Sequence, residues 1–330
     1  MCFLCSAKRL ANARDTTFTS LLPRWPQPHG ATQAGEAAGA WTAPTPQGRH
    51  LAASVRQGRR GFVQQLAAGA AATALGGFSS AHAQVDVGRA SGLRKLVPAQ
   101  QLEEAAAGQY QQMMAEARQK GALAPSNHPQ VRQLRAIAKR LIPHATPWND
   151  RAQHWRWEVN LIASQQINAF CMPGGKIAFY TGILDELKLS NDEAAMIMGH
   201  EMAHALREHA RERLAKTQAT SFGLSIGARL LGLGDLGDVA ANLGTQLLSL
   251  RFSREDETEA DLVGLELAAR SAYTPQAGVS LWQKMSAASG GGSSGLSFLS
   301  THPSGPARIE TLQANVPKVM GLYEQARRGG

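Results

Sequence analysis

Three residues of this chain, His200, Glu201 and His204, have the types and spacing needed to bind a metal ion and activate water. If residues 200–204 are helical, two histidines four positions apart project from the same helix face. Both imidazoles can then reach one tetrahedral zinc ion, while Glu201 can act on a water molecule bound to the metal. A charged surface helix that carries two histidines is the alternative interpretation.

The residues before this motif favour a buried helix. Ser190 or Asn191 can cap its N-terminus, and two acids follow in the first turn. Residues 194–198 read Ala-Ala-Met-Ile-Met, an apolar run that is too continuous for a surface helix. Because an unpaired imidazole inside a buried helix is costly, a metal ion would satisfy both histidines. We therefore expect a helix over about 191–215.

A catalytic zinc site requires a third protein ligand. In one arrangement that ligand is a later histidine, in the pattern H-E-x-x-H-x-x-G-x-x-H. Here Arg207 and Ala210 occupy the glycine and histidine positions, so this arrangement is excluded. His209 lies one residue too early for it, and we expect His209 to have a structural role.

A glutamate on a later helix is the other source of a third ligand. Glu257 and Asp261 are four positions apart and share a helix face. Glu257 can bind zinc while Asp261 accepts the outer ring N–H of a ligand histidine. A solvated acidic face is the alternative interpretation, and we assign Glu255, Asp256 and Glu259 to such a face.

The elements that would position these residues are mostly helices. Proline boundaries and helical spacing predict helices over 99–120 and 129–141. Alternating or apolar runs predict strands over 154–162, 167–171 and 176–180, with Pro173-Gly174-Gly175 as a turn. Further helices are expected over about 254–271, 275–288 and 305–315, with a flexible Gly/Ser loop at 289–295. The expected fold class is α+β, mostly helical with a small β-sheet beside the active-site helix.

Composition and charge limit the function classes. The chain has 330 residues, of which 43% are hydrophobic, which excludes global disorder. Most of the net charge of +9 lies in residues 1–83, and the remainder lacks a basic cluster interleaved with aromatic residues. Nucleic acid is therefore not an expected partner. Of the three cysteines, Cys2 and Cys5 precede the mature chain proposed below, and Cys171 is expected to be a small buried hydrophobic residue.

The N-terminal segment has the features of a cleavable export signal. Arg59 and Arg60 precede a moderately apolar stretch over 66–78, and Ala81-His82-Ala83 supplies a cleavage site. The arginine pair favours twin-arginine export, and the Sec route is the alternative. Residues 1–50 are predicted to be a disordered extension or an upstream over-extension of the reading frame. We expect cleavage after Ala83 and a periplasmic location, with no lipid anchor because Gln84 stands where a lipoprotein has cysteine.

These segments give the expected domain organisation. Residues 1–83 form the extension and signal, residues 84–124 an N-terminal helical segment, residues 125–318 the zinc domain, and residues 319–330 a flexible tail. The apolar stretch over 221–250 is interrupted by charged residues and is too polar to span a bilayer.

Four ordered motifs resemble those of one enzyme family. They are His-Glu-Met-Ala-His at 200–204, Ser-Arg-Glu-Asp-Glu-Thr-Glu-Ala-Asp at 253–261, Asn-Ala-Phe at 168–170 with the turn at 173–175, and Thr-His-Pro at 301–303 followed by Arg308-Ile309. Over roughly residues 125–315 the chain resembles the HtpX/Oma1-type zinc metallopeptidases, peptidase family forty-eight of the metallo class. It resembles the soluble periplasmic, BepA-like branch, although no tetratricopeptide domain is expected.

The resemblance implies a gluzincin fold and one Zn²⁺ per chain, held by His200, His204 and Glu257. It implies Glu201 as the general base and Asp261 as the partner of a ligand histidine. The strand at 167–171 is similar to an edge that pairs with extended substrate, so Asn168 and Ala169 would lie nearest the cleaved bond.

The resemblance leaves two roles open. His302 would either stabilise the oxyanion or occupy the open zinc position and keep the enzyme latent, with the loop at 289–295 allowing it to move. Arg308 would orient that segment or contact substrate.

The implied function is a zinc-dependent metalloendopeptidase that cleaves misfolded periplasmic or outer-membrane proteins. Unfolded or misassembled envelope proteins would be its partners, together with peripheral association with a membrane. The alternatives are a periplasmic holdase-type chaperone with a mostly latent zinc site, in which 221–250 forms a client surface, and a purely structural zinc domain.

Overall fold

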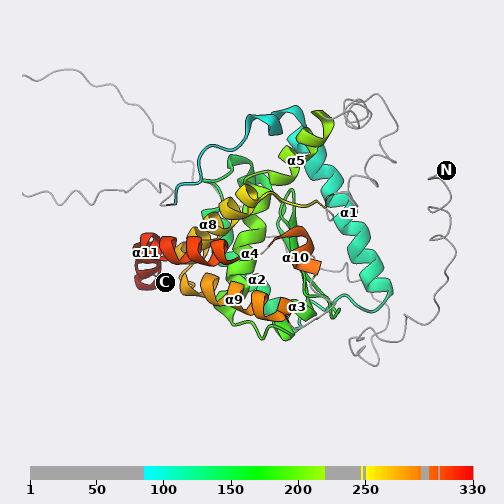
Figure 1. The fold of residues 1–330 in the computed structure, drawn as a ribbon. Coiled ribbons are helices and arrows are strands. Elements are labelled where there is room, and N and C mark those ends of the chain that lie inside the picture. Colours follow the sequence, from blue (N-terminus) through cyan, green and yellow to red (C-terminus); the bar gives the residue numbers. More distant parts are fainter. Residues whose placement is uncertain (1–84, 220–246, 248–249, 291–296, 304, 330) are drawn as a thin grey trace, which may run out of the picture.

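A computed structural model describes residues 85–219, 247, 250–290, 297–303 and 305–329 (Figure 1). Helices predominate, with one small sheet, as the sequence predicts. The helices are α1 (Ala99–Gln119), α2 (Pro129–Leu141), α3 (Thr181–Asp185), α4 (Asn191–Leu206), α5 (His209–Ala219), α8 (Arg254–Arg270), α9 (Gln276–Gly290), α10 (Ser297–Thr301) and α11 (Pro306–Arg328). Short 3-10 helices are η2 (Gly92–Leu96), η3 (Ile142–His144) and η4 (Asp150–His154).

The sheet contains β1 (Glu158–Ile162), β2 (Ala169–Met172) and β3 (Lys176–Tyr180) in the order β1-β3-β2. β1 pairs with β3 in parallel and β2 pairs with β3 antiparallel, so β2 is an edge strand. The tight turn between β2 and β3 requires its glycines, since Gly174 and Gly175 both have positive φ. A Cβ on Gly175 would lie only 2.6 Å from the Trp157 ring.

Each face of the sheet packs against a different set of helices. Side chains alternate along β2, so Ala169 and Cys171 join the core formed with α2, α4 and α8. Phe170 and Met172 instead join the apolar residues of α1 on the opposite face. Figure 1 shows α1 along one side of the molecule and α11 on the other, with α4 between them. This packing places α4, which carries the His-Glu-x-x-His motif, directly beside the edge strand β2.

Helix α4 begins with a reciprocal cap. Ser190 Oγ accepts from the Glu193 N–H at 3.2 Å, and Glu193 Oε2 accepts from the Ser190 N–H at 2.8 Å. Both histidines and the glutamate of the motif are buried, as predicted. The predicted single helix over 191–215 is wrong, because α4 ends at Leu206 and Glu208 adopts a φ of 60°. Helix α5 then starts at His209.

Helix α8 crosses α4 at a very close approach between two glycines. A Cβ on Gly264 would lie 2.7 Å from the His200 backbone nitrogen, and one on Gly199 would lie 2.9 Å from the Gly264 carbonyl oxygen. Only the absence of side chains at this crossing allows the two backbones to approach so closely. This contact sets Glu257 and Asp261 on α8 opposite the histidines of α4.

Three predicted boundaries need correction. The strand predicted over 154–162 begins only at Glu158, because His154 is the last residue of η4, a 3-10 helix that starts where Asn149 Oδ1 accepts from the Arg151 N–H at 3.0 Å. The strand predicted over 167–171 begins only at Ala169. Helix α11 continues to Arg328, with Val319 and Leu322 buried, so residues 319–328 are not a flexible tail.

Several expectations lie outside the described residues. They are the export signal and the extension before it, most of the apolar stretch over 221–250, and all but two residues of the Gly/Ser loop at 289–295. Residues 289 and 290 belong to α9. Within the described ranges, no helix is both long enough and apolar enough to cross a membrane.

Candidate metal centre

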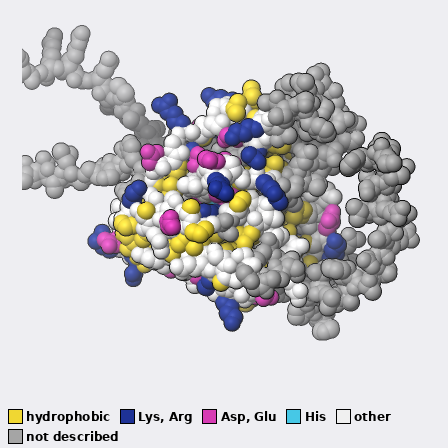
Figure 2. All heavy atoms as spheres, viewed as in Figure 1, with side chains coloured by type: hydrophobic (Ala, Val, Ile, Leu, Met, Phe, Trp, Pro, Cys, Tyr) yellow, Lys and Arg dark blue, Asp and Glu magenta, His cyan; other side chains and the backbone are white. Residues whose placement is uncertain are grey.

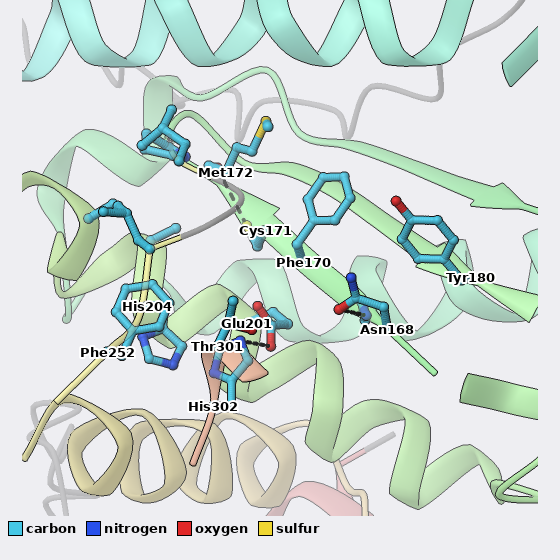
Figure 3. Close-up of a pocket in the computed structure, with 16 residues that line it drawn as sticks. Asn168, Phe170, Cys171, Met172, Tyr180, Glu201, His204, Phe252, Thr301 and His302 are labelled. Carbon is cyan, nitrogen blue, oxygen red and sulfur yellow. Dashed lines mark hydrogen bonds and ion pairs between the residues drawn. The ribbon is translucent and has the colours of Figure 1, made fainter. Parts of the chain in front are cut away.

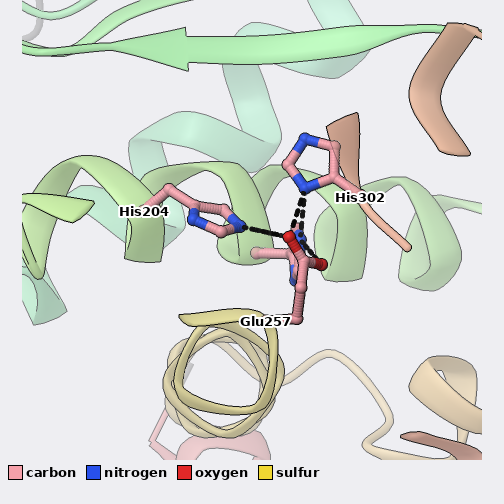
Figure 4. A group of neighbouring side chains, drawn as sticks. His204, Glu257 and His302 are labelled. Atoms are coloured by element: carbon pink, nitrogen blue, oxygen red, sulfur yellow. Dashed lines mark hydrogen bonds and ion pairs between the residues drawn. The ribbon is translucent and has the colours of Figure 1, made fainter. Parts of the chain in front are cut away.

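Four buried side chains from three elements converge beside the sheet (Figure 4). His200 and His204 come from α4, Glu257 from the first turn of α8, and His302 directly follows α10. One potential ligand atom from each lies within 4.8 Å of the other three. All four residues are at most 3% exposed. The sequence predicted the first three as ligands and His302 as an uncertain neighbour.

The distances within this cluster fit a tetrahedral metal ion. His200 Nε2 lies 3.2 Å from His204 Nε2 and 3.4 Å from His302 Nδ1. Glu257 oxygens lie 3.0 Å from His302 Nδ1, 3.5 Å from His200 Nε2 and 3.6 Å from His204 Nε2. Ligand bonds of about 2.0–2.1 Å to tetrahedral zinc place the ligand atoms about 3.3 Å apart. The four side chains therefore have the spacing of a zinc coordination shell.

His200 is oriented from behind by an aspartate. Its Nδ1 lies 3.0 Å from Asp261 Oδ1, so His200 is the ligand histidine that Asp261, predicted to partner one of the two, contacts. Asp261 also accepts two hydrogen bonds of 2.7 Å from Arg308 and one of 3.2 Å from Trp282. Burial alone would raise the pKa of Asp261, but Arg308 and His200 lower it to about 2. The ionised carboxylate thus holds the hydrogen on Nδ1 of His200 and leaves Nε2 free to bind a metal.

His204 has a partner that the sequence did not predict. His209, expected to be merely structural, lies with its Nδ1 at 2.9 Å from His204 Nδ1. Its Nε2 lies 3.3 Å from Glu259 Oε2, so the tautomer with its hydrogen on Nε2 donates to Glu259 and accepts from His204. The Nε2 atoms of both ligand histidines then carry lone pairs that face each other across 3.2 Å. A cation between them resolves this repulsion, so the donor set fits a metal ion.

The charge states of these groups suit metal binding. Burial lowers the pKa of His204 well below its usual value, so this imidazole is neutral. Burial alone would raise the pKa of Glu257, but His302, His200 and Arg308 hold it below its usual value. A neutral imidazole and an ionised carboxylate are the forms that bind zinc.

Glu201 lies between the cluster and the edge strand. Burial raises its pKa, although the nearby His302 and His200 oppose that shift. The backbone of Cys171 in β2 hydrogen-bonds to this carboxyl group. A carboxylate with a raised pKa is suited to take up and release a proton near neutral pH.

His302 contacts both the metal ligands and Glu201. Its Nδ1 faces Glu257 at 3.0 Å, and its Nε2 lies 3.5 Å from Glu201 Oε1. Its ring stacks on Phe298 with the ring centres 4.4 Å apart. Burial alone would lower the pKa of His302, but Glu201 and Glu257 raise it. His302 therefore occupies the fourth corner of the cluster and engages Glu201 at the same time.

A cavity of about 170 Å³ runs from this centre along the edge of β2 (Figure 3). Asn168 and Ala169, predicted to bind substrate, line it together with Glu201 and His302. Within the described ranges, the β2 edge away from β3 pairs with no strand. Ala210, Leu247, Leu250 and Phe252 give the cavity an apolar side.

Arg308 does not line this cavity. It lies behind the four clustered side chains, where it pairs with Asp261 and contacts Glu257 Oε2 at 2.6 Å. Its guanidinium also lies 3.5 Å from the centre of the Trp282 ring. Of the two roles left open by the sequence, this position supports orientation rather than substrate contact.

The acidic residues of α8 are less exposed than the sequence suggested. Asp256 is 5% exposed and accepts from the Ser253 N–H at 2.8 Å, closing a reciprocal cap. Glu259 is half-buried and bonds to Arg207 and His209. Assigning these two residues to a solvated face was wrong. Asp256 caps the start of α8, and Glu259 bonds to side chains that follow α4. Glu255 is exposed, as expected.

Comparison with known proteins gives a consistent result. Residues 129–316 match Peptidase family M48. The chain is 36% identical over 210 residues to the mitochondrial metalloendopeptidase OMA1 of Schizosaccharomyces pombe, covering 63% of this chain and 59% of that protein. It is 26% identical over 198 residues to the metalloprotease LoiP of Escherichia coli, covering 59% of this chain and 73% of LoiP.

A more distant relative is the beta-barrel assembly-enhancing protease of Yersinia pestis, 26% identical over 159 residues, with 45% of this chain and 32% of that protein covered. The chain spans about three fifths or less of the length of the OMA1 proteins that it matches.

Proposed function

The chain belongs to peptidase family M48, and we propose that it is a zinc-dependent metalloendopeptidase that cleaves misfolded proteins of the bacterial periplasm and outer membrane. The family predicted from the sequence is confirmed, and with it the metalloprotease class of the domain. The observation that carries the proposal is the buried cluster of three histidines and a glutamate with a second glutamate beside it.

His200, His204 and Glu257 would hold the metal ion. Zinc, when bound there, polarises the scissile carbonyl and lowers the pKa of water. Glu201 takes the proton of the attacking water and passes it to the amine that leaves. Its raised pKa and its position between the cluster and the cavity support this role.

The edge of β2 supports an extended substrate. Backbone N–H and C=O groups on an unpaired edge can bind a peptide strand of almost any sequence. Asn168 and Ala169 lie where such a strand would pass Glu201. Recognition through the backbone suits an enzyme whose substrates share an unfolded state rather than a sequence.

His302 supports a latent resting state. It contacts Glu257 and Glu201 together, so it would compete with substrate for the open metal position and for the base. Stabilisation of the oxyanion is the alternative role, and it would require His302 to leave Glu257 and face the substrate carbonyl.

The catalytic proposal is tested by following degradation of unfolded, labelled casein with zinc supplied. E201Q should lower the rate by about 100-fold or more, because the water loses its proton acceptor. E255Q makes the same chemical change at an exposed position of α8 and should match the wild type. Equal rates for wild type and E201Q would refute the enzymatic proposal.

The location and substrates are proposed from two sources. The signal-like segment at 59–83 favours export, and the Yersinia relative is by name a protease that enhances β-barrel assembly. Proteomics of a strain that carries E201Q should show accumulated periplasmic and outer-membrane proteins. An unchanged envelope proteome would contradict quality control as the role.

A holdase-type chaperone with a mostly latent zinc site is the second candidate, and the position of His302 in the fourth corner favours it. A holdase would suppress aggregation of an unfolded client equally well as wild type and as E201Q. A peptidase would need Glu201 for its effect on that client.

Peripheral membrane association is proposed from the segment before α1. Leu93 and Leu96 are 44% and 63% exposed, and they flank Arg94 and Lys95 in η2. Figure 2 shows hydrophobic and basic side chains together at the top of the molecule, over this segment. Such a pair of leucines beside cations suits an anionic lipid surface. Co-sedimentation with anionic vesicles should fall when both leucines are changed to serine.

A further inference from the structure

The break between α4 and α5 brings His209 to the rear of a metal ligand. On a continuous helix, a residue five positions after His204 would point about 140° away from it. Instead, Glu208 adopts a φ of 60°, and the chain turns so that the two Nδ1 atoms lie 2.9 Å apart. A positive φ at a non-glycine residue costs on the order of 1 kcal/mol or more and persists only where the surroundings hold it.

The surroundings do hold this turn. The carboxylate of Glu208 pairs with Arg94 at 2.8 Å and with Arg211 at 2.8 Å. Arg207, the residue before it, donates from Nε to Glu259 Oε2 at 2.7 Å. The same arginine donates to the carbonyl oxygens of Val87 and Gly88 at 3.3 and 3.1 Å. The strained turn is therefore fixed by groups from the N-terminal segment and from α8.

Each motif histidine then has a carboxylate and an arginine behind it. For His200 the carboxylate is Asp261, in direct contact, and the arginine is Arg308. For His204 the carboxylate is Glu259, held by Arg207, and His209 lies between imidazole and carboxylate. His209 is 2% exposed, so no water competes for its two ring nitrogens.

We propose that His209 is a positioning residue that fixes the ring orientation and tautomer of His204, with Glu259 and Arg207 holding His209 in place. His209 accepts the hydrogen of His204 Nδ1, which keeps Nε2 of His204 directed at the metal. This inference rests on the proposed metal site, since it assigns a role toward the metal that His204 would bind. Partners of this kind typically change metal affinity by about 10–100-fold.

Two isosteric substitutions, H209N and H209Q, test the proposal, with H209L as an apolar reference. The amide oxygen of asparagine can take the place of Nδ1 in His209, whereas glutamine places its polar atoms near the position of Nε2. H209N therefore keeps the acceptor for His204, and H209Q keeps the contact with Glu259 but loses that acceptor. H209L loses both contacts.

Zinc affinity of the full-length chain is measured by competition with a chromophoric chelator. H209Q and H209L should bind zinc about 10–100-fold more weakly than wild type, and H209N should stay close to wild type. The visible absorption bands of the cobalt-substituted protein should change in H209Q and remain in H209N. Unfolding by urea in the presence of a chelator reports the stability of each metal-free variant.

The outcomes separate the two proposals. A wild type that binds no zinc would overturn the metal site itself. A wild type that binds zinc with the same affinity as H209L and H209Q would overturn the role of His209 alone. Equal losses in H209N and H209Q would also overturn it, because a general packing role would not distinguish the acceptor position.

Discussion

The proposed latency of the site depends on His302. It occupies the fourth corner of the cluster through Nδ1 and faces Glu201 through Nε2. Removing its ring would therefore free both the metal position and the base.

H302A should raise the rate of casein degradation several-fold if His302 holds the site latent. The physical reason is that water and substrate can then enter the position that the imidazole occupied. H154A removes an exposed histidine far from the cluster along the chain and should leave the rate unchanged. A fall of the H302A rate to the level of E201Q would contradict latency and indicate oxyanion stabilisation.

The sequence predicted most of the residue-scale chemistry. His200, Glu201 and His204 follow from helical spacing, and Asp261, predicted to partner a ligand histidine, contacts His200. His209 was missed because its position depends on the left-handed turn at Glu208, which hydrophobic spacing does not encode. Its only sequence signal was a third histidine close after the motif.

At the scale of elements, the start of α4 depends on Glu193. Its carboxylate accepts from the Ser190 N–H, from Ser280 and from Lys284 Nζ at 2.7 Å. Burial alone would raise the pKa of Glu193, but these partners hold it below the usual 4.5. The fold therefore favours the ionised form, and the stabilisation is complete above pH 4.5 and is lost as the pH falls below that value.

E193Q should lower the free energy of unfolding by about 1 kcal/mol at pH 7, because the cap and the ion pair lose their charge. The difference from wild type should shrink as the pH falls below 4.5. Urea unfolding at several pH values, with a chelator present, measures it. E186Q alters an exposed glutamate and should show neither effect; a pH-independent loss for E193Q would contradict the assignment.

The crossing of α4 and α8 is the second element on which the site depends. G264A should cost about 1–3 kcal/mol and weaken zinc binding, since its Cβ would push Glu257 away from the histidines. G108A, in α1, meets no atom within 4 Å and should be neutral or slightly stabilising. Calorimetry and zinc titration measure both variants, and unchanged zinc affinity in G264A would show that the crossing does not set the ligand geometry.

Element types were predictable where hydrophobic periodicity was strong, and boundaries were not. The helices at 99–119 and 129–141 follow the predicted ranges closely. Helix α11 runs past its predicted end because Val319 and Leu322 pack on the core, a tertiary contact that local sequence does not reveal. Asp256 could have been recognised as a cap partner, since it lies three residues after Ser253.

At the scale of the whole molecule, the N-terminal segment is tied to the catalytic helices. Val85 is 3% exposed and donates its N–H to Glu266 of α8 at 3.0 Å. Arg207 binds the carbonyl groups of Val87 and Gly88. The folded body therefore includes Val85, two residues after the proposed cleavage site.

The mature protein should accordingly begin at Gln84. Cleavage after Ala83 would remove the signal and leave every contact of Val85 intact. Intact-mass measurement of the protein from a periplasmic fraction checks this. A mature chain that starts beyond Val85, or one that keeps Arg59 and Arg60, would contradict the proposed processing.

The most direct test of the account is the position of zinc in the resting enzyme. Anomalous diffraction at the zinc edge should show one ion per chain, about 2.0–2.2 Å from His200 Nε2, His204 Nε2, a Glu257 oxygen and His302. That result would establish both the metal site and its closure by His302. Absence of zinc from these four side chains, in crystals grown with zinc, would contradict the central claim.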